Sequence, residues 1–296
     1  MRDEKGRLLP QSEVTFQCVL LFVLLLITAA FVIPFLLVIG TSFVSKEEVA
    51  RRGFVFLPEV WDFSAYNMML FQNNEIWRAY AVTLFVVVVG TMVCLLVTSS
   101  FSYVVAKKHL PGRQFLIGMA FVTMIFGGGL VPTYMVVKSL KLIDSLWCLI
   151  IPTAMSVWNM LILRNFFYTI PESLEESALL DGAQPYQVFF RIILPLSKPA
   201  LATIGLFYAV EKWNSWFDAA IWLNDAKLYP LQLVLRKYVL MSSTQELTFD
   251  LATGSKPPDM AIKSAIVVVS TLPMLCIYPF IQKYFVKGVL IGSVKG

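Results

Sequence analysis

Residues 79–106, AYAVTLFVVVVGTMVCLLVTSSFSYVVA, contain no charged side chain. A helix of about 20 apolar residues crosses a bilayer core about 30 Å thick. An open strand would leave its backbone amides and carbonyls unpaired in lipid, whereas a helix pairs them within itself. This stretch therefore predicts a membrane-spanning helix and an all-α membrane protein.

The composition of the whole chain agrees with that prediction. Apolar residues make up 58% of the 296 residues and charged residues 15%, whereas soluble domains have about 45–50% and about 25%. A soluble enzyme would expose too much apolar surface at this composition, and intrinsic disorder requires low hydrophobicity. The net charge of +5 is too small to favour nucleic acid as a partner. The composition therefore predicts that the chain is embedded in a lipid membrane.

Five other runs are long and apolar in the same way, although 196–223 carries several charges. The first could be a cleaved signal peptide, but its apolar stretch is about twice the usual signal core, so we interpret it as a retained span. Together the runs predict six transmembrane helices, at 14–40, 79–106, 114–137, 145–163, 196–223 and 261–285.

Six spans place both termini on one side of the membrane. Residues 107–113 contain three Lys or Arg and no acid, and basic residues gather in cytoplasmic loops. This loop favours cytoplasmic tails at 1–13 and 286–296 and an extracytoplasmic loop at 41–78. The total of Lys and Arg is nearly equal on the two sides, so the orientation rests mainly on a motif at 176–195.

The segment between the fourth and fifth runs has the pattern of a helix pair. Thr169 and Glu172 have the spacing of a capping box. Gly182 is placed to end the first helix, Pro185 to begin the second, and Pro195 to mark the return to the membrane. The segment is either a solvated surface element or a docking element for a soluble partner, because exposed aromatic residues beside carboxylates are unusual in a loop without one.

A motif inside this segment resembles the EAA motif of ABC-importer permeases. That motif has the form E-A-A-x-x-x-G, nine residues, then I-x-L-P, and residues 176–195 keep the spacing throughout. Ser177 replaces the first alanine by another small residue. The residues that the resemblance assigns to ATPase coupling are Glu176, Ser177, Ala178, Asp181, Gly182, Leu194 and Pro195.

The resemblance extends over essentially the whole chain. Four internal segments and the end of the sequence are similar to the carbohydrate uptake family of ABC importers, in its YtcP-like group related to the maltose permeases. These segments are 127–134, 152–159, 213–217, 229–233 and 278–296.

The resemblance implies the type I ABC importer permease fold, with cytoplasmic coupling helices, in the cytoplasmic membrane of a bacterium. The tail 1–13, span 14–40 and loop 41–78 then precede a core domain at 79–285, which holds five helices and a coupling region at 169–194. The implied partners are a second, non-identical permease, two cytoplasmic ATPases and an extracytoplasmic sugar-binding protein. The implied cargo is a carbohydrate, most simply an oligosaccharide.

The sequence offers no catalytic or metal site. It contains no G-x-x-x-x-G-K-[ST] phosphate loop, and Gly127–Gly129 is not followed by the required lysine. The four cysteines lie in separate apolar runs, and His109 is the single histidine. We therefore predict a chain that is not an enzyme and holds no cofactor, with ATP and magnesium bound by the partner ATPases.

Span 196–223 is the candidate substrate path because it carries charges at membrane depth. An unpaired charge there costs at least about 2.5–3.5 kcal/mol unless it faces water. In a continuous helix Glu211, Ser215 and Asp218 would share one face, beside a face with two tryptophans. Aromatic rings beside polar groups suit a sugar. The candidate path residues are Glu211, Trp213, Asn214, Trp216 and Asp218, with Trp158 and Asn159 from the fourth run.

Other interpretations remain open. An internal Glu211–Lys212 pair and an aromatic seam against the partner permease would explain the same residues by packing. An ion-coupled secondary transporter could use Glu211 or Asp218 as its proton or sodium site. An integral membrane enzyme would need a nucleophile or metal cluster that the sequence does not show.

Overall fold

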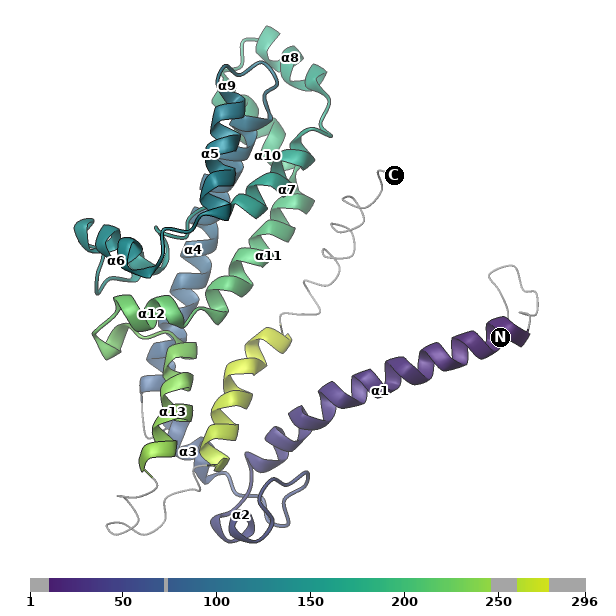
Figure 1. Cartoon of the computed structure of the whole chain (residues 1–296), viewed down its shortest axis with the longest axis vertical. Helices are drawn as coiled ribbons and strands as arrows, with labels where there is room; N and C mark the ends of the chain where they lie inside the picture. The colour runs from purple at the N-terminus through teal and green to yellow at the C-terminus, as the bar shows by residue number, and fades with distance from the viewer. Residues whose placement is uncertain (1–10, 72–73, 246–259, 277–296) are drawn as a thin grey trace. The chain divides into compact units, whose positions relative to one another are not determined.

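The structure is a computed structural model that describes residues 11–71, 74–245 and 260–276. Every regular element in these ranges is a helix (Figure 1), which confirms the all-α class. The chain divides into two compact units, residues 1–73 with 241–271 and residues 74–240 with 272–296.

The first unit begins with α1 (Gln11–Thr41), which contains the first predicted span. Its segment Thr15–Thr41 is long and apolar enough to cross a membrane, and no residue of its most apolar stretch is buried within the chain. A helix that is apolar all round needs lipid or another protein to cover it. This helix therefore has the character expected of a membrane span.

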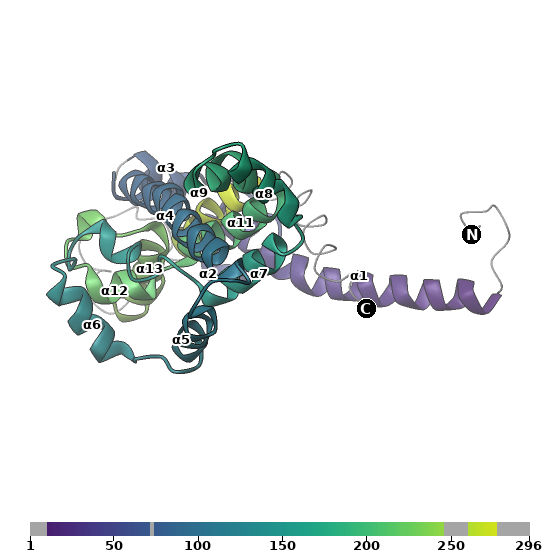
Figure 2. The same cartoon turned by 90° about the horizontal axis from the view of Figure 1, so that it is seen from above.

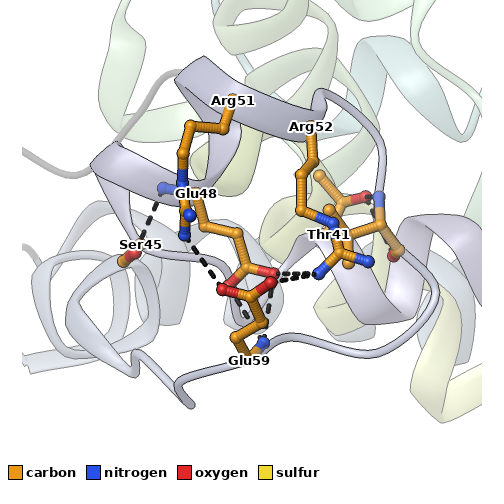
Figure 3. Close-up of polar contacts among 7 residues, drawn as sticks. Thr41, Ser45, Glu48, Arg51, Arg52 and Glu59 are labelled. Carbon is orange, nitrogen blue, oxygen red and sulfur yellow. Dashed lines mark hydrogen bonds and ion pairs between the residues drawn. The ribbon is translucent and has the colours of Figure 1, made fainter.

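A small polar network follows α1. Glu48 lies on α2 (Lys46–Arg52), and its carboxylate is 2% exposed. It accepts hydrogen bonds from Arg52 Nη1 at 2.9 Å and from the backbone N–H of Glu59 at 3.1 and 3.0 Å (Figure 3). Arg51 and Arg52 also pair with the Glu59 carboxylate. A buried carboxylate is stable only when it is paired in this way, so the network holds the loop around residue 59 against α2.

Close backbone packing holds the same region to the end of α1. Thr41 Oγ1 accepts a hydrogen bond from the Val55 amide at 3.1 Å. A Cβ added at Gly40 would lie 2.2 Å from the carbonyl oxygen of Phe56 and 2.3 Å from that of Val55. Before α3 (Ser64–Phe71), residues 41–63 thus form an ordered cap that requires glycine at position 40.

We expect Gly40→Val to destabilise this cap by about 1–3 kcal/mol, the usual cost of overpacking. The rate of trypsin cleavage at Arg51 and Arg52 in purified membranes should rise, because cleavage requires α2 to open. Gly118→Val is the control, since a Cβ there meets nothing within 4 Å. Equal cleavage rates in the two variants would show that Gly40 is not a close-packing position.

The second unit is built on α4 (Glu75–Ala106), α7 (Val157–Phe167) and α11 (Lys198–Asn214), which pack together. Small residues bring α4 and α11 close: a Cβ at Gly205 would lie 3.1 Å from Leu95. Tyr208 on α11 joins this contact through its buried hydroxyl, which lies 2.6 Å from Thr98 Oγ1 and accepts a hydrogen bond from the Ser156 amide at 2.9 Å. Small residues and interhelical hydrogen bonds are the usual means of helix association in membranes.

Three of the predicted spans are not single continuous helices. The run 114–137 forms α5 (Arg113–Ile125) and α6 (Leu130–Ser139), bent by 118° at the glycines 127–129. The break follows from Gly129, whose φ of 80° lies in the left-handed region. The other two interrupted runs give a 3-10 turn η1 (Leu146–Leu149) before α7, and α11 followed by α12 (Phe217–Trp222).

The number of spans stays a prediction. Among the described residues, two helices are long and apolar enough to cross a membrane, or up to four if each bent pair forms one span. Met260–Cys276 is a shorter apolar helix within the predicted sixth span. Most of tail 1–13, the end of span 261–285 and tail 286–296 lie outside the described residues. The remaining elements are η3 (Ala226–Leu228) and α13 (Leu231–Gln245).

Candidate functional site

The candidate site is a helix pair at one end of the second unit. It comprises α8 (Glu172–Leu180) and a second helix formed by α9 (Pro185–Val188), the π-helix η2 (Phe189–Ile193) and α10 (Leu194–Leu196). Figure 1 shows α8 and α9 at one end of the α4–α7–α11 bundle and α12 toward the other end. Figure 2, seen from above, shows α8 and α9 next to each other. We call residues 172–196 the helix pair.

The predicted capping box at the start of α8 is wrong. Thr169 Oγ1 donates to the carbonyl of Phe166 at 2.7 Å, so it belongs to the end of the preceding helix. Pro171 is the N-cap residue, and no side chain caps α8 there. Thr169 and Glu172 have the spacing of a capping box. The Thr169 hydroxyl nevertheless donates to the carbonyl of an earlier residue, Phe166, and does not accept from an amide at the start of α8.

The predicted turn at Gly182 is confirmed. Its φ is 86°, a conformation that side chains with a Cβ rarely adopt. The Gly182 amide donates to the Leu179 carbonyl at 3.0 Å, and the Ala183 amide donates to the Ala178 carbonyl at 3.0 Å. These two bonds are those of a Schellman motif, which pairs the last carbonyls of a helix. The turn therefore ends α8 rigidly.

The second helix begins at Pro185, as predicted, and widens before Pro195. Gln187 Oε1 accepts the Gln184 amide at 2.9 Å, which pairs one of the free amides at the helix start. Pro195 has no N–H to donate to the carbonyl of Arg191, and the turn at Phe189–Ile193 is a π-helix. A π-turn accommodates such a missing bond. The chain then turns by 83° into α11.

The motif residues divide between an exposed face and a packed one. Ala178 and Leu194 pack against an apolar cluster with Phe167 and Val188. The exposed motif residues are Glu176, Ser177, Asp181, Gly182 and Pro195.

Large apolar side chains accompany the exposed face. Leu180 is 89% exposed, Tyr186 63% and Phe190 52%. They lie outside the long apolar helices, and exposed apolar side chains gathered in this way are typical of an interaction surface. The helix pair thus presents carboxylates and apolar side chains together.

The opposite side of α8 faces the basic segment that follows α4. A cavity of about 200 Å³ lies there, lined by Lys107, His109, Glu175 and Leu179 among others. At its rim the Lys108 ammonium lies 2.8 Å from the Glu172 carboxylate. This hydrogen bond and charge lower the pKa of Glu172 and raise the pKa of Lys108. Both groups are exposed, so the pair orients α8 more than it stabilises it.

The candidate path residues do not share one helical face. α11 ends at Asn214, and Ser215 has an extended backbone before α12 begins at Phe217. The register that would align Glu211, Ser215 and Asp218 is therefore broken. Of the path residues, Trp213 and Asn159 are buried within the chain, Trp216 and Asp218 are half-buried, and Glu211, Asn214 and Trp158 are exposed.

Trp216 forms a cation–π contact with a residue that the sequence analysis did not include in the path. The guanidinium of Arg236, on α13, lies 3.6 Å from the centre of the Trp216 ring. Arg236 is exposed, so this cation–π pair presents both an aromatic face and a charged donor. Sequence reasoning did not predict this pair, because Trp216 precedes α12 and Arg236 lies 20 positions further on, on α13.

Lys212 does not pair with Glu211. Its ammonium is buried and donates to the Leu149 carbonyl at 2.8 Å and to the hydroxyl of Thr153. Glu211 is exposed and forms no ion pair among the described residues. Neighbouring residues on a helix point about 100° apart, which explains why the two side chains separate. The lysine joins α11 to the irregular segment before α7.

Comparisons with known proteins give relatives over nearly the whole length. No protein-family model matches the chain. It is 46% identical over 274 residues to the "Polygalacturonan/rhamnogalacturonan transport system permease protein YtcP" of Bacillus subtilis (strain 168), covering 92% of this chain and 96% of the relative. It is 45% identical over 265 residues to "Protein LplC" of the same organism, with 90% of each chain covered.

One solved structure is similar as well. A chain of "a bacterial ABC transporter involved in the import of the acidic polysaccharide alginate" matches with a TM-score of 0.84 at 30% identity, over 94% of this chain and 99% of that one. These findings confirm the resemblance that the motif at 176–195 indicated.

Proposed function

Because this chain belongs to the permease family of ABC sugar importers, we propose that it is the membrane subunit through which ATP-driven uptake of an oligosaccharide proceeds. In this proposal it forms the pore with a second, non-identical permease. Two cytoplasmic ATPases drive the pair, and an extracytoplasmic binding protein delivers the sugar. The chain itself is not an enzyme, and ATP and magnesium are bound by the ATPases.

The observation that carries the proposal is the exposed face of the helix pair. Glu176 and Asp181 stand there beside Leu180, which is 89% exposed. A soluble partner that covers this face would bury the apolar side chains and meet the carboxylates with cations. The Schellman turn at Gly182 supports a coupling role for the helix pair. A helix with a rigid end transmits a displacement, whereas a flexible loop would not.

The orientation in the membrane follows from this role. An ATPase acts in the cytoplasm, so the helix pair, the basic segment 107–113 and both termini lie on that side in our proposal. The loop 41–78 then lies outside, where it can meet the binding protein. The basic segment beside α8 agrees with the preference of Lys and Arg for cytoplasmic loops.

The proposed substrate is an acidic oligosaccharide and not a neutral one. Relatives are named for transport of polygalacturonan or rhamnogalacturonan and for import of an acidic polysaccharide. In this chain the exposed Arg236 lies over Trp216, and a guanidinium can hold a carboxylate by two hydrogen bonds while the ring covers a sugar face. We therefore propose an oligosaccharide that carries carboxylates. Asp218 and Glu211 remain proposed path residues.

Purification of the complex from native membranes in mild detergent tests the assembly, with mass spectrometry of its subunits. Uptake of a labelled oligogalacturonide and of a maltooligosaccharide into proteoliposomes then tests function. We expect uptake of the oligogalacturonide that requires ATP on the cytoplasmic side. Uptake by this chain alone, collapsed by an ionophore and indifferent to ATP, would instead establish the ion-coupled transporter.

A further inference from the structure

Two side chains at the C-terminal end of α4, one in its last turn and one at its C-cap, contact α8. Tyr103 and Lys107 lie one helical turn apart, and both bind the carboxylate of Glu175. Tyr103 donates its hydroxyl to Glu175 Oε1 at 2.8 Å. The Lys107 ammonium pairs with Glu175 Oε2 and lies 4.2 Å from the centre of the Tyr103 ring. One carboxylate of α8 is therefore held at both oxygens by one helix.

Packing fixes the position of these groups. The Tyr103 ring lies 5.0 Å from that of Phe189, in the second helix of the pair, and 6.2 Å edge-on from that of Phe167, at the end of α7. The Glu175 side chain is only 20% exposed. Hydrogen bonds to a charged group are about twice as strong as neutral ones, and this burial shields them from water. The contact is thus firmer than the exposed Lys108–Glu172 pair.

The carboxylates of α8 consequently divide into two sets. Glu172 and Glu175 face their own chain and are paired with lysines. Glu176 and Asp181 are exposed and form no ion pair among the described residues. Glu176 also lines the cavity beside Lys107, but both unpaired carboxylates are exposed and available to a partner. Glu175 already holds α8 to the end of α4, a helix that packs along both α7 and α11.

We propose that Tyr103, Lys107 and Glu175 form a latch between α4 and α8 through which movement of the helix pair reaches the membrane helices. These three are positioning residues: they contact neither ATP nor sugar. The inference rests on the proposed function, since it assumes an ATPase on the outer face of α8. To the proposed function it adds a contact within this chain, through which a movement of α8 caused by the docked ATPase displaces α4.

The test uses the complete complex in proteoliposomes and measures sugar uptake per ATP hydrolysed. In Glu175→Gln, which removes the charge at nearly constant shape, this ratio should fall about five- to twentyfold, within the usual range of coupling between two sites. The ATPase subunits should still co-purify in wild-type proportion, because Glu176 and the exposed apolar residues are untouched. Tyr103→Phe removes one hydroxyl only and should lower the ratio less.

Two further variants separate a latch from general damage. Lys107→Glu combined with Glu175→Lys restores opposite charges in reverse and should recover part of the lost ratio. Tyr168→Phe is the matched control, because it also removes a phenol hydroxyl, one that bonds to Arg113 and does not involve α8. Its ratio should equal that of the wild type.

The outcomes are distinct. A wild-type ratio in Glu175→Gln would overturn the latch. Loss of the ATPases from Glu175→Gln and Tyr103→Phe would overturn it as well, since the residues would then shape the docking face. If the wild-type complex contains no ATPase, the proposed function fails, whatever the variants do.

Discussion

Replacing Glu176 by lysine is expected to weaken ATPase association about 30-fold and to lower sugar uptake with it. Glu176 is the exposed first residue of the motif and forms no ion pair among the described residues, so reversal of its charge leaves the fold of the chain intact. At a docking surface the reversal places like charges together, which costs about 2 kcal/mol or more. A difference of about 1.4 kcal/mol changes an association constant tenfold.

The measurement is the amount of ATPase retained per permease during purification, together with uptake per assembled complex. Glu47→Lys is the matched control: it reverses an exposed acid on the short helix α2, outside the helix pair. We expect it to retain the ATPases fully. If Glu176→Lys assembles and transports at the wild-type rate, residues 172–196 are not the coupling element.

The second large effect is expected on stability. Lys212→Met should destabilise the α4–α7–α11 bundle by about 1–3 kcal/mol, the cost of losing hydrogen bonds from a charged donor; the two acceptors stay bonded to each other at 3.1 Å. The groups concerned are the Leu149 carbonyl and the Thr153 hydroxyl. Methionine keeps most of the aliphatic stem that packs near Gly90. The loss of stability therefore measures the contribution of the ammonium group and not the cost of a cavity.

Thermal unfolding of the purified protein in nanodiscs measures this loss. Lys227→Met, at an exposed position of η3, is the control and should unfold like the wild type. An unchanged Lys212→Met would contradict the contact geometry, whereas equal destabilisation of Glu211→Ala and Lys212→Met would restore the interpretation that Glu211 and Lys212 are a pair.

The helix pair shows how far local sequence patterns predict structure. Gly182 and Pro185 were correctly predicted to end α8 and to begin the second helix, because each residue acts on its own backbone. The capping box failed because it depends on which of two neighbours Thr169 binds. Spacing alone does not distinguish the carbonyl of Phe166 from an amide of α8.

The interrupted spans show the complementary limit. A count of apolar residues reports affinity for lipid but says little about backbone continuity, so 114–137 was expected to be one helix. The glycines at 127–129 mark a place where a helix can break, but neither the 118° bend nor its effect on the span follows from composition.

Within the candidate site, the contacts that sequence reasoning missed are all distant in sequence. Glu175 meets Tyr103 across 72 positions, and Lys212 meets the Leu149 carbonyl across 63. The signal for Lys212 was present, since a lysine in an apolar run must find a partner. Its partner is a backbone carbonyl, and every residue offers one, so the sequence could not identify it.

The most direct test of the central claim places a photo-crosslinking amino acid at Leu180, the most exposed of the large apolar residues of the helix pair. The same group at Leu96, an exposed position within α4, serves as the control. In the native complex we predict that position 180 crosslinks to an ATPase subunit and that position 96 does not. If an ATPase co-purifies but position 180 forms no crosslink to it, the helix pair is not the docking element, and the account of coupling given above is wrong.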